Sequence, residues 1–155
     1  MTAETGAILI VEDDENDARM LEHTLRETAV LNPIEVVHSA REAIAFLEQT
    51  FPYGAGEKYP VRIILLDLKL PGMDGFEFLD WLGRRVEFED VLVVVVSGLD
   101  QLSEIRRAYA LGADSFLTKP CRGLDVENLI QWFPGYWERP GIIPASANRE
   151  TAHAS

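Results

Sequence analysis

The fold is decided by the stretch Ile63-Ile64-Leu65-Leu66-Asp67-Leu68-Lys69-Leu70-Pro71-Gly72-Met73-Asp74-Gly75. Its first four residues are apolar, and they pass directly into a carboxylate. A continuous apolar run suits a strand that is covered on both faces, as in a parallel sheet between two layers of helices. Pro71, Gly72 and Gly75 stop the strand and allow the chain to turn. We therefore expect Asp67 at the carboxyl end of a central strand, where open α/β sheets bind their ligands.

Four other short apolar runs have the same character as this strand. They cover residues 7–11, 34–38, 91–96 and 115–118. Helical periodicity predicts five helices. The first starts near residue 15, the second opens with a capping-box pattern at 39–42, and the others cover about 75–82, 100–111 and 124–133. Strands that alternate with helices predict an α/β fold with a doubly wound, five-stranded parallel sheet. Short right-handed crossovers favour the flavodoxin-like strand order 2-1-3-4-5.

The length of 155 residues suits one domain with a full core, and 47% of the residues are hydrophobic. Helical periodicity fails after Pro134, where prolines and glycines recur and the last residues are small and polar. We expect one domain over residues 1–134, followed by a partly disordered tail over 135–155.

The net charge of −12 is unfavourable for binding the phosphates of DNA or RNA. We therefore expect no nucleic-acid partner. Cys121 is the only cysteine, so neither an intrachain disulfide nor a zinc site of several thiolates can form. The first residues lack an apolar signal segment, and the longest apolar run, Val91 to Val96, is too short to span a membrane. These features predict a cytoplasmic protein without a membrane partner.

Polar side chains follow four of the predicted strands, at the point where each strand ends. In chain order they are Glu12, Asp13 and Asp14, then Asp67, Ser97 and Lys119. Because parallel strands share one carboxyl edge and these strands are neighbours in the predicted order, the groups should converge there. We expect Asp14 to act instead as the cap of the helix that starts at Glu15.

The chemistry of this edge follows from its charge. Clustered carboxylates repel one another unless they share a cation, and hard oxygen ligands with open positions suit Mg²⁺, with Mn²⁺ as an alternative. A carboxylate such as Asp67 can attack phosphorus and form an aspartyl phosphate. Lys119 and the Ser97 hydroxyl would then bind the oxygens of the phosphoryl group.

With these residues in place, the sequence resembles a bacterial two-component response regulator, in particular the small chemotaxis-regulator-like receivers. The resemblance covers about residues 6–133. It rests on Val11-Glu12-Asp13-Asp14, Leu66 to Gly75, Ser97-Gly98, Gly112-Ala113-Asp114 and Leu117-Thr118-Lys119-Pro120. It implies a receiver fold and a signalling protein that catalyses only its own phosphorylation and dephosphorylation.

The resemblance also implies the roles of single residues. Asp67 would be the phosphoacceptor; Asp13, Asp67 and the backbone carbonyl of Lys69 would bind the metal, and Glu12 would act through water. Ser97 and Phe116 would form the switch, and Lys119 would bind the phosphoryl group. The Lys119-Pro120 peptide is expected to be cis, which X-Pro chemistry permits at low cost.

The implied partners are a sensor histidine kinase and a downstream protein target or phosphotransfer protein. Phosphorylation would change the surface of the fourth helix, fifth strand and fifth helix. The loop before Tyr59 and the aromatic ending resemble the regulators that partner bacterial phytochromes, so the kinase could be a bacteriophytochrome. Trp132, Phe133, Tyr136 and Trp137 would then form a dimer or partner surface; alternatively, they pack onto the core.

Two other functions fit the sequence less well than a receiver. A phosphatase of the haloacid-dehalogenase type also uses a nucleophilic aspartate, but it needs a second acid at the position of Lys69. An adaptor that has kept the fold would not need the full acceptor, metal and lysine set. Both are therefore less favoured than a phosphorylation switch.

Overall fold

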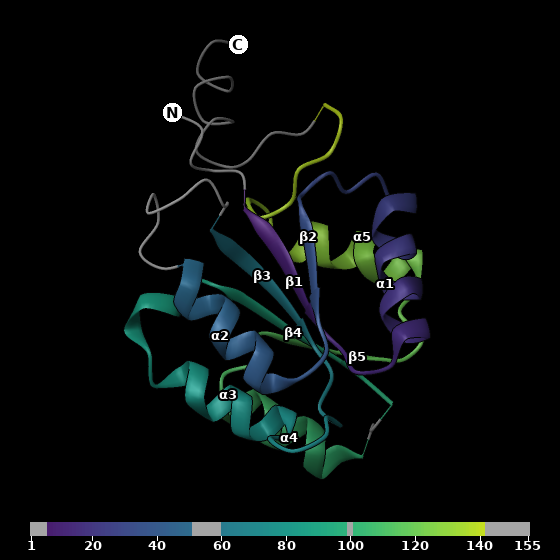
Figure 1. Cartoon of the computed structure of the whole chain (residues 1–155). Helices are drawn as coiled ribbons and strands as arrows, with labels where there is room; N and C mark the ends of the chain where they lie inside the picture. The colour runs from purple at the N-terminus through teal and green to yellow at the C-terminus, as the bar shows by residue number, and fades with distance from the viewer. Residues whose placement is uncertain (1–5, 51–59, 99–100, 142–155) are drawn as a thin grey trace.

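The computed structural model describes residues 6–50, 60–98 and 101–141. Figure 1 shows its helices and strands. In chain order they are β1 (Ala7–Val11), α1 (Glu15–Glu27), β2 (Ile34–Val37), α2 (Ala40–Thr50), β3 (Val61–Leu66), α3 (Gly75–Gly83), the short 3-10 helix η1 (Val86–Phe88), β4 (Leu92–Ser97), α4 (Leu102–Ala110), β5 (Ser115–Thr118) and α5 (Gly123–Trp132).

The five strands form one parallel sheet in the order β2-β1-β3-β4-β5, which confirms the predicted topology. In register, Val11 at the end of β1 lies beside Leu66 at the end of β3, and Leu66 lies beside Val95 of β4. The polar residues that follow these strands therefore leave the sheet at nearly the same level.

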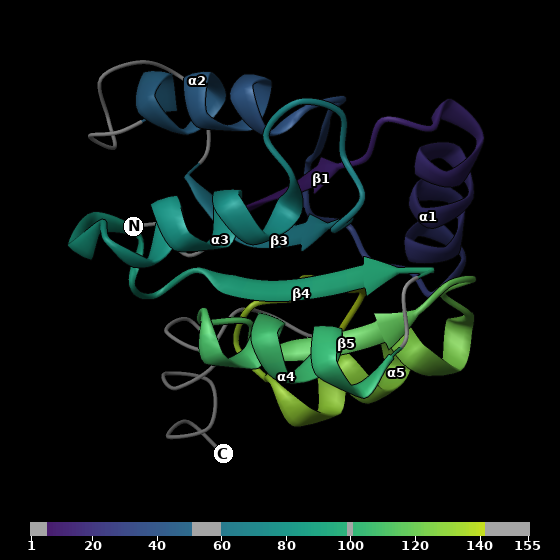
Figure 2. The same ribbon diagram turned by 90° about the horizontal axis from the view of Figure 1, so that it is seen from below.

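Helices cover both faces of the sheet, as Figure 2 shows from below with the strands running across the picture. On one face α2, α3 and α4 bury a cluster that includes Leu47, Phe78 and Ala108. On the other face α1 and α5 bury a second cluster, which includes Leu25 and Val126. Residues of β1, β3 and β4 alternate between the two clusters, which explains why their sequences are apolar without interruption.

The two helices that follow β1 and β3 begin with side-chain caps. The Asp14 carboxylate accepts a hydrogen bond from the Asp17 amide, so the predicted capping role is confirmed. Asp74 and Glu77 form a capping box at the start of α3. Each cap fixes where the chain turns away from the edge that carries the predicted site.

Gly72 and Gly75 shape the connection from β3 to α3 for different reasons. Gly72 has a φ of 71°, the left-handed conformation that glycine adopts most easily. A Cβ atom on Gly75 would lie 2.5 Å from the Cα of Leu68 and 2.7 Å from the Asp67 carbonyl oxygen. Gly75 is therefore required by close backbone approach, whereas the sequence suggested a turn.

Several predicted boundaries shift by one or two residues. β3 begins at Val61, two residues before the predicted start, and β4 begins at Leu92. The helix η1 was not predicted, because its three residues are too few to show a period. The long loop predicted before Tyr59 lies largely outside the described residues, as does the tail beyond residue 141.

Side chains continue to pack onto the domain past Pro134, where the sequence placed the end of the domain. Trp137 is only 2% exposed and packs in the cluster under α1 and α5. Periodicity could not reveal this, because a single aromatic anchor outside a helix leaves no repeating pattern. We call residues 134–141 the C-terminal strap; in Figure 1 its later part is the yellow segment beside the start of β1.

The strap is held by the buried side chain of Asn32 in the α1–β2 loop. The Asn32 amide nitrogen donates to the carbonyl oxygens of Gly6 (2.9 Å) and Tyr136 (3.0 Å), and its side-chain oxygen accepts from the Glu138 amide (2.8 Å). The Leu31 amide also donates to the Glu138 carbonyl oxygen. These bonds fix the strap against the amino-terminal edge of the sheet, opposite the predicted site.

None of the helices within residues 6–50, 60–98 and 101–141 is long and apolar enough to cross a membrane.

Candidate phosphoacceptor and cation site

The site lies at the carboxyl edge of the sheet, where the strand ends are tied together by backbone hydrogen bonds. The Asp67 amide donates to the Val11 carbonyl oxygen (3.0 Å), and the Lys119 amide donates to the Ser97 carbonyl oxygen (2.9 Å). These bonds extend the parallel pairing by one residue beyond the strands. They place the predicted groups of β1 with those of β3, and those of β4 with those of β5.

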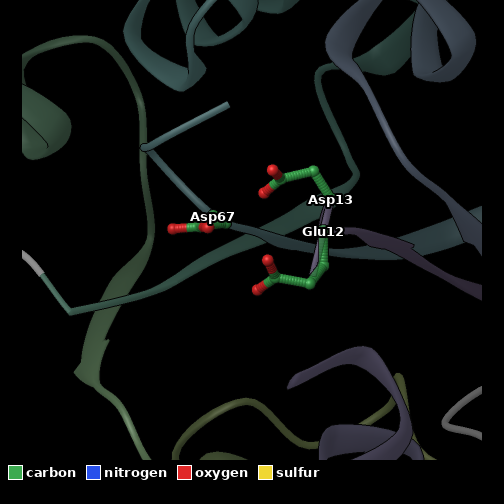
Figure 3. A group of neighbouring side chains, drawn as sticks. All are labelled: Glu12, Asp13 and Asp67. Atoms are coloured by element: carbon green, nitrogen blue, oxygen red, sulfur yellow. The ribbon is translucent and has the colours of Figure 1, made fainter. Parts of the chain in front are cut away.

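Glu12, Asp13 and Asp67 form a carboxylate cluster. One oxygen from each lies within 4.8 Å of the others. Figure 3 shows the three side chains turned toward a common space, Glu12 and Asp13 from the end of β1 and Asp67 from the end of β3. Glu12 and Asp67 are 4% and 5% exposed, whereas Asp13 is exposed. The cluster thus combines two buried carboxylates with one that is open to solvent.

Lys119 provides the positive charge beside this cluster. Its Nζ lies 2.7 Å from Glu12 Oε1, 2.9 Å from Asp17 Oδ2 and 3.3 Å from Asp67 Oδ2. Asp17 is absent from the predicted site, because an acid in the first turn of a helix is explained by the helix dipole alone. Only the three-dimensional position of α1 against β5 reveals the contact.

The electrostatics of Glu12 and Lys119 follow from burial and from each other. Burial raises the pKa of the Glu12 carboxyl to about 7, although hydrogen bonds from Lys119 and from the Asp14 amide oppose the rise. For Lys119, burial lowers the pKa, but the hydrogen bonds to Glu12 and Asp17 and the charge of Asp67 outweigh it, so the pKa is raised. The lysine therefore stays charged at neutral pH.

The remaining predicted site residues surround the cluster. Ser97 is fully buried at the end of β4, and Phe116 is half-buried on β5, where it packs against the core under α4. The exposed Lys69 donates its backbone N–H to Asp67 Oδ1 at 3.3 Å. The Lys119-Pro120 peptide is cis, as predicted.

The carboxylate cluster, Ser97, Lys69 and Lys119 line one surface hollow of about 460 Å³. Its walls are Glu12, Asp13, Asp14, Asp17, Asp67, Lys69, Ser97, Gly98 and Lys119. Three converging carboxylates with one neighbouring ammonium leave an excess of negative charge. Their oxygens are hard ligands, which fit a divalent cation of the Mg²⁺ or Mn²⁺ type. The structure thus satisfies the requirements of a cation site that opens toward bulk solvent.

The four aromatic residues of the predicted partner surface separate into two groups. Trp137 is buried, so its assignment to a surface is wrong and the alternative, packing onto the core, holds for it. Phe133 and Tyr136 are partly buried and pack against the same cluster. The Tyr136 hydroxyl donates to the Asp90 carbonyl oxygen. Trp132, at the end of α5, is 61% exposed.

Comparison with known proteins agrees with this arrangement. A family model described as the response regulator receiver domain matches residues 8–131. Response regulator Rcp1 of Synechocystis sp. is 27% identical over 90% of this chain and 93% of its own. Its Mn²⁺-bound crystal structure superposes with a TM-score of 0.68 over 90% of this chain and 99% of that chain.

Two other solved structures extend the similarity. The bacteriophytochrome response regulator AtBRR is 28% identical, with a TM-score of 0.73 over 86% of this chain and 95% of that one. The phosphorylated cyanobacterial phytochrome response regulator RcpA is 26% identical, with a TM-score of 0.68 over 90% of this chain and 99% of that one.

Proposed function

Because the chain belongs to the response regulator receiver domain family, we propose that Asp67 accepts a phosphoryl group from a sensor histidine kinase. The observation that carries this assignment is the position of the Asp67 carboxylate. It lies in the hollow with Lys119 Nζ at 3.3 Å from one oxygen and the Lys69 amide at 3.3 Å from the other. Nearly buried and held on both oxygens, it is fixed in orientation and open only toward the hollow.

The transfer would be a displacement at phosphorus. An oxygen of Asp67 forms a bond to the phosphorus of a phosphohistidine while the bond from phosphorus to the imidazole nitrogen breaks. The imidazole leaves as a neutral base after it takes up a proton from solvent. Lys119 donates to a phosphoryl oxygen and so stabilises the negative charge that three equatorial oxygens share.

We assign the cation as Mg²⁺, with Mn²⁺ able to replace it. Asp13, Asp67 and the carbonyl oxygen of Lys69 would hold it directly, and Glu12 through water. When bound, such a cation neutralises the phosphoryl oxygens and the cluster. The same site supports phosphorylation of the chain by small phosphodonors and its own dephosphorylation by water, so the protein acts on no substrate but itself.

Signalling would proceed through Ser97 and Phe116. The buried Ser97 hydroxyl turns toward the phosphoryl group, and the half-buried ring of Phe116 turns inward. The surface of α4, β5 and α5 then changes its affinity for a downstream protein or phosphotransfer protein. The partial burial of Phe116 supports this role, because the ring has both core contacts and solvent on one side.

The similarity to AtBRR and RcpA supports a kinase of the bacteriophytochrome class as the partner. Trp132 supports a homodimer, because a large aromatic side chain that is 61% exposed on α5 is typical of an interface. Sedimentation of the wild type and Trp132→Ala, with and without phosphorylation, tests the dimer. If both proteins stay monomeric at high concentration, the dimer is excluded.

The phosphoacceptor is tested by incubation with acetyl phosphate or a phosphoramidate in the presence of Mg²⁺. Intact mass spectrometry should show one phosphoryl adduct that base removes and that Asp67→Asn abolishes. Asp74→Asn is the matched control: it also neutralises one aspartate near the strand end, but asparagine caps α3 equally well. This variant should label like the wild type.

The same assay separates the alternatives. A protein that folds normally, binds cations and takes no label under any condition would be the phosphorylation-independent adaptor. Turnover of unrelated phosphate esters would indicate a phosphatase, although Lys69 occupies the position where such an enzyme needs its second acid.

A further inference from the structure

We propose that Asp17 restrains Lys119 in the unphosphorylated protein and thereby slows phosphorylation of Asp67. Asp17 belongs to the first turn of α1, whereas Lys119 follows β5, so the contact joins two elements that are far apart in sequence. The inference rests on the function proposed above, because it concerns the lysine that binds the phosphoryl group.

The Lys119 ammonium is saturated by carboxylates. It has three N–H bonds, and three acids lie within reach: Glu12 at 2.7 Å, Asp17 at 2.9 Å and Asp67 at 3.3 Å. A phosphodonor that enters the hollow therefore meets a lysine with no proton to offer. One of the three contacts has to open before Lys119 can donate to a phosphoryl oxygen.

Asp17 is the partner that can leave at the lowest cost. The side chains of Glu12 and Asp67 are 5% and 6% exposed, whereas that of Asp17 is 41% exposed. Once released, Asp17 can be solvated by water. Release of Asp67 before the transfer would leave a buried carboxylate beside two others without a positive neighbour, which is strongly unfavourable.

The charge of Asp17 acts in the same direction as its hydrogen bond. Asp17 lines the hollow together with Asp13 and Asp14, so an incoming phosphoryl dianion meets its negative charge at short range. Removing the carboxylate both frees a donor on Lys119 and lowers this repulsion. The two effects predict faster phosphorylation, whereas a residue that aimed Lys119 productively at Asp67 would give slower phosphorylation when removed.

The test measures the rate of labelling by acetyl phosphate as a function of its concentration, at saturating Mg²⁺ and low ionic strength. Asp17→Asn should raise the rate by about two- to fivefold, as expected from the loss of one partly exposed ion pair. The gain should appear mainly as a lower concentration for half-maximal rate, because the freed ammonium binds the donor before transfer. Asp17→Glu restores a carboxylate and should return the rate toward that of the wild type.

Asp14→Asn is the matched control for charge. It removes one carboxylate from the same hollow and keeps the cap of α1, but Asp14 is not among the three acids that contact Lys119. Its rate should rise by less than that of Asp17→Asn. Equal increases in the two variants would mean that charge alone acts, and would overturn the proposed restraint.

A second readout needs neither phosphorylation nor metal. In ¹⁵N spectra of the metal-free protein, the Lys119 ammonium protons should exchange with water faster in Asp17→Asn than in the wild type. Unchanged exchange, or an unchanged or reduced labelling rate in Asp17→Asn, overturns the inference. If the wild type and every variant fail to label while the exchange difference is present, the proposed function fails and the contact itself stands.

Discussion

The Lys119 ammonium lies 2.7 Å from Glu12 Oε1, yet burial raises the pKa of Glu12 to about 7. A close positive partner normally lowers the pKa of a carboxyl group, so desolvation is the larger effect for this residue. The negative neighbour Asp67 acts in the same direction as burial. Glu12 therefore carries its charge in the folded protein at an energetic cost.

This cost predicts how the stability of the metal-free protein depends on pH. The pKa of Glu12 rises from 4.5 in the unfolded chain to about 7 in the fold, so the folded state binds more protons between these values. The contribution of Glu12 to the free energy of unfolding must then fall as pH rises from about 4.5 to about 7, and stay constant above. Glu12→Gln, which mimics the protonated form, should become more stable relative to the wild type over that range.

The expected gain is on the order of 3 kcal/mol at pH 8, as urea denaturation at a series of pH values would show. The comparison of the two proteins cancels the contributions of the ionisable groups that they share. A difference that stays constant between pH 5 and pH 8 would contradict the raised pKa. Added Mg²⁺ should reduce the difference, because it stabilises the ionised wild type.

Gly75→Ala should distort the loop that carries Asp67. The added Cβ would overlap the Leu68 backbone and the Asp67 carbonyl oxygen, and backbone cannot yield as a side chain can. We expect the free energy of unfolding to fall by about 1–3 kcal/mol, with slower phosphorylation of Asp67. Gly83→Ala on the same helix is the control. Its Cβ would meet only the Leu111 carbonyl oxygen at 3.5 Å, and the helix should gain up to about 1 kcal/mol.

Asn32→Ala should loosen the C-terminal strap. The change leaves three backbone groups without their partner: the carbonyl oxygens of Gly6 and Tyr136 and the Glu138 amide. We expect a loss of about 2–4 kcal/mol in urea denaturation, together with faster hydrogen exchange in residues 136–139. The exposed Asn16 on α1 provides the comparison, since Asn16→Ala should change stability by less than about 0.5 kcal/mol.

Replacing Trp132 and replacing Trp137 should lower stability by very different amounts. Trp137→Ala removes a buried side chain and should cost about 3–5 kcal/mol. Trp132→Ala removes an exposed one and should cost less than about 1 kcal/mol while the monomer is studied at low concentration. Similar losses in both variants would show that the division between core and surface is wrong.

The sheet could be predicted from sequence because each strand gives a strong local signal. The run Ile63 to Leu66 is apolar on both faces, and the β-branched run that ends at Ser97 is equally clear. Strand order followed from the short crossovers between them. The folded region past Pro134 could not be predicted, since it depends on the burial of Trp137 and on hydrogen bonds from the Asn32 side chain to backbone more than a hundred residues away.

The carboxylate cluster was likewise predictable, because Glu12, Asp13 and Asp67 directly follow strands that share one edge. Asp17 was not. A first-turn acid has a sufficient local explanation, and its contact with Lys119 depends on where α1 lies relative to the residues that follow β5. Sequence patterns thus identified groups positioned by the sheet and missed one positioned by the packing of a helix.

The C-terminal strap also decides how this protein can be joined to other molecules in the laboratory. The described chain ends at Gly141, beside the amino-terminal edge of the sheet, while Asp67 opens at the carboxyl edge. A fluorescent reporter fused after residue 141 would thus extend from the side of the molecule away from the phosphoacceptor, leaving access for a kinase. The same fusion made at Pro134 would remove Trp137 from the core, and reduced signalling in such a chimera would reflect unfolding instead of a blocked site.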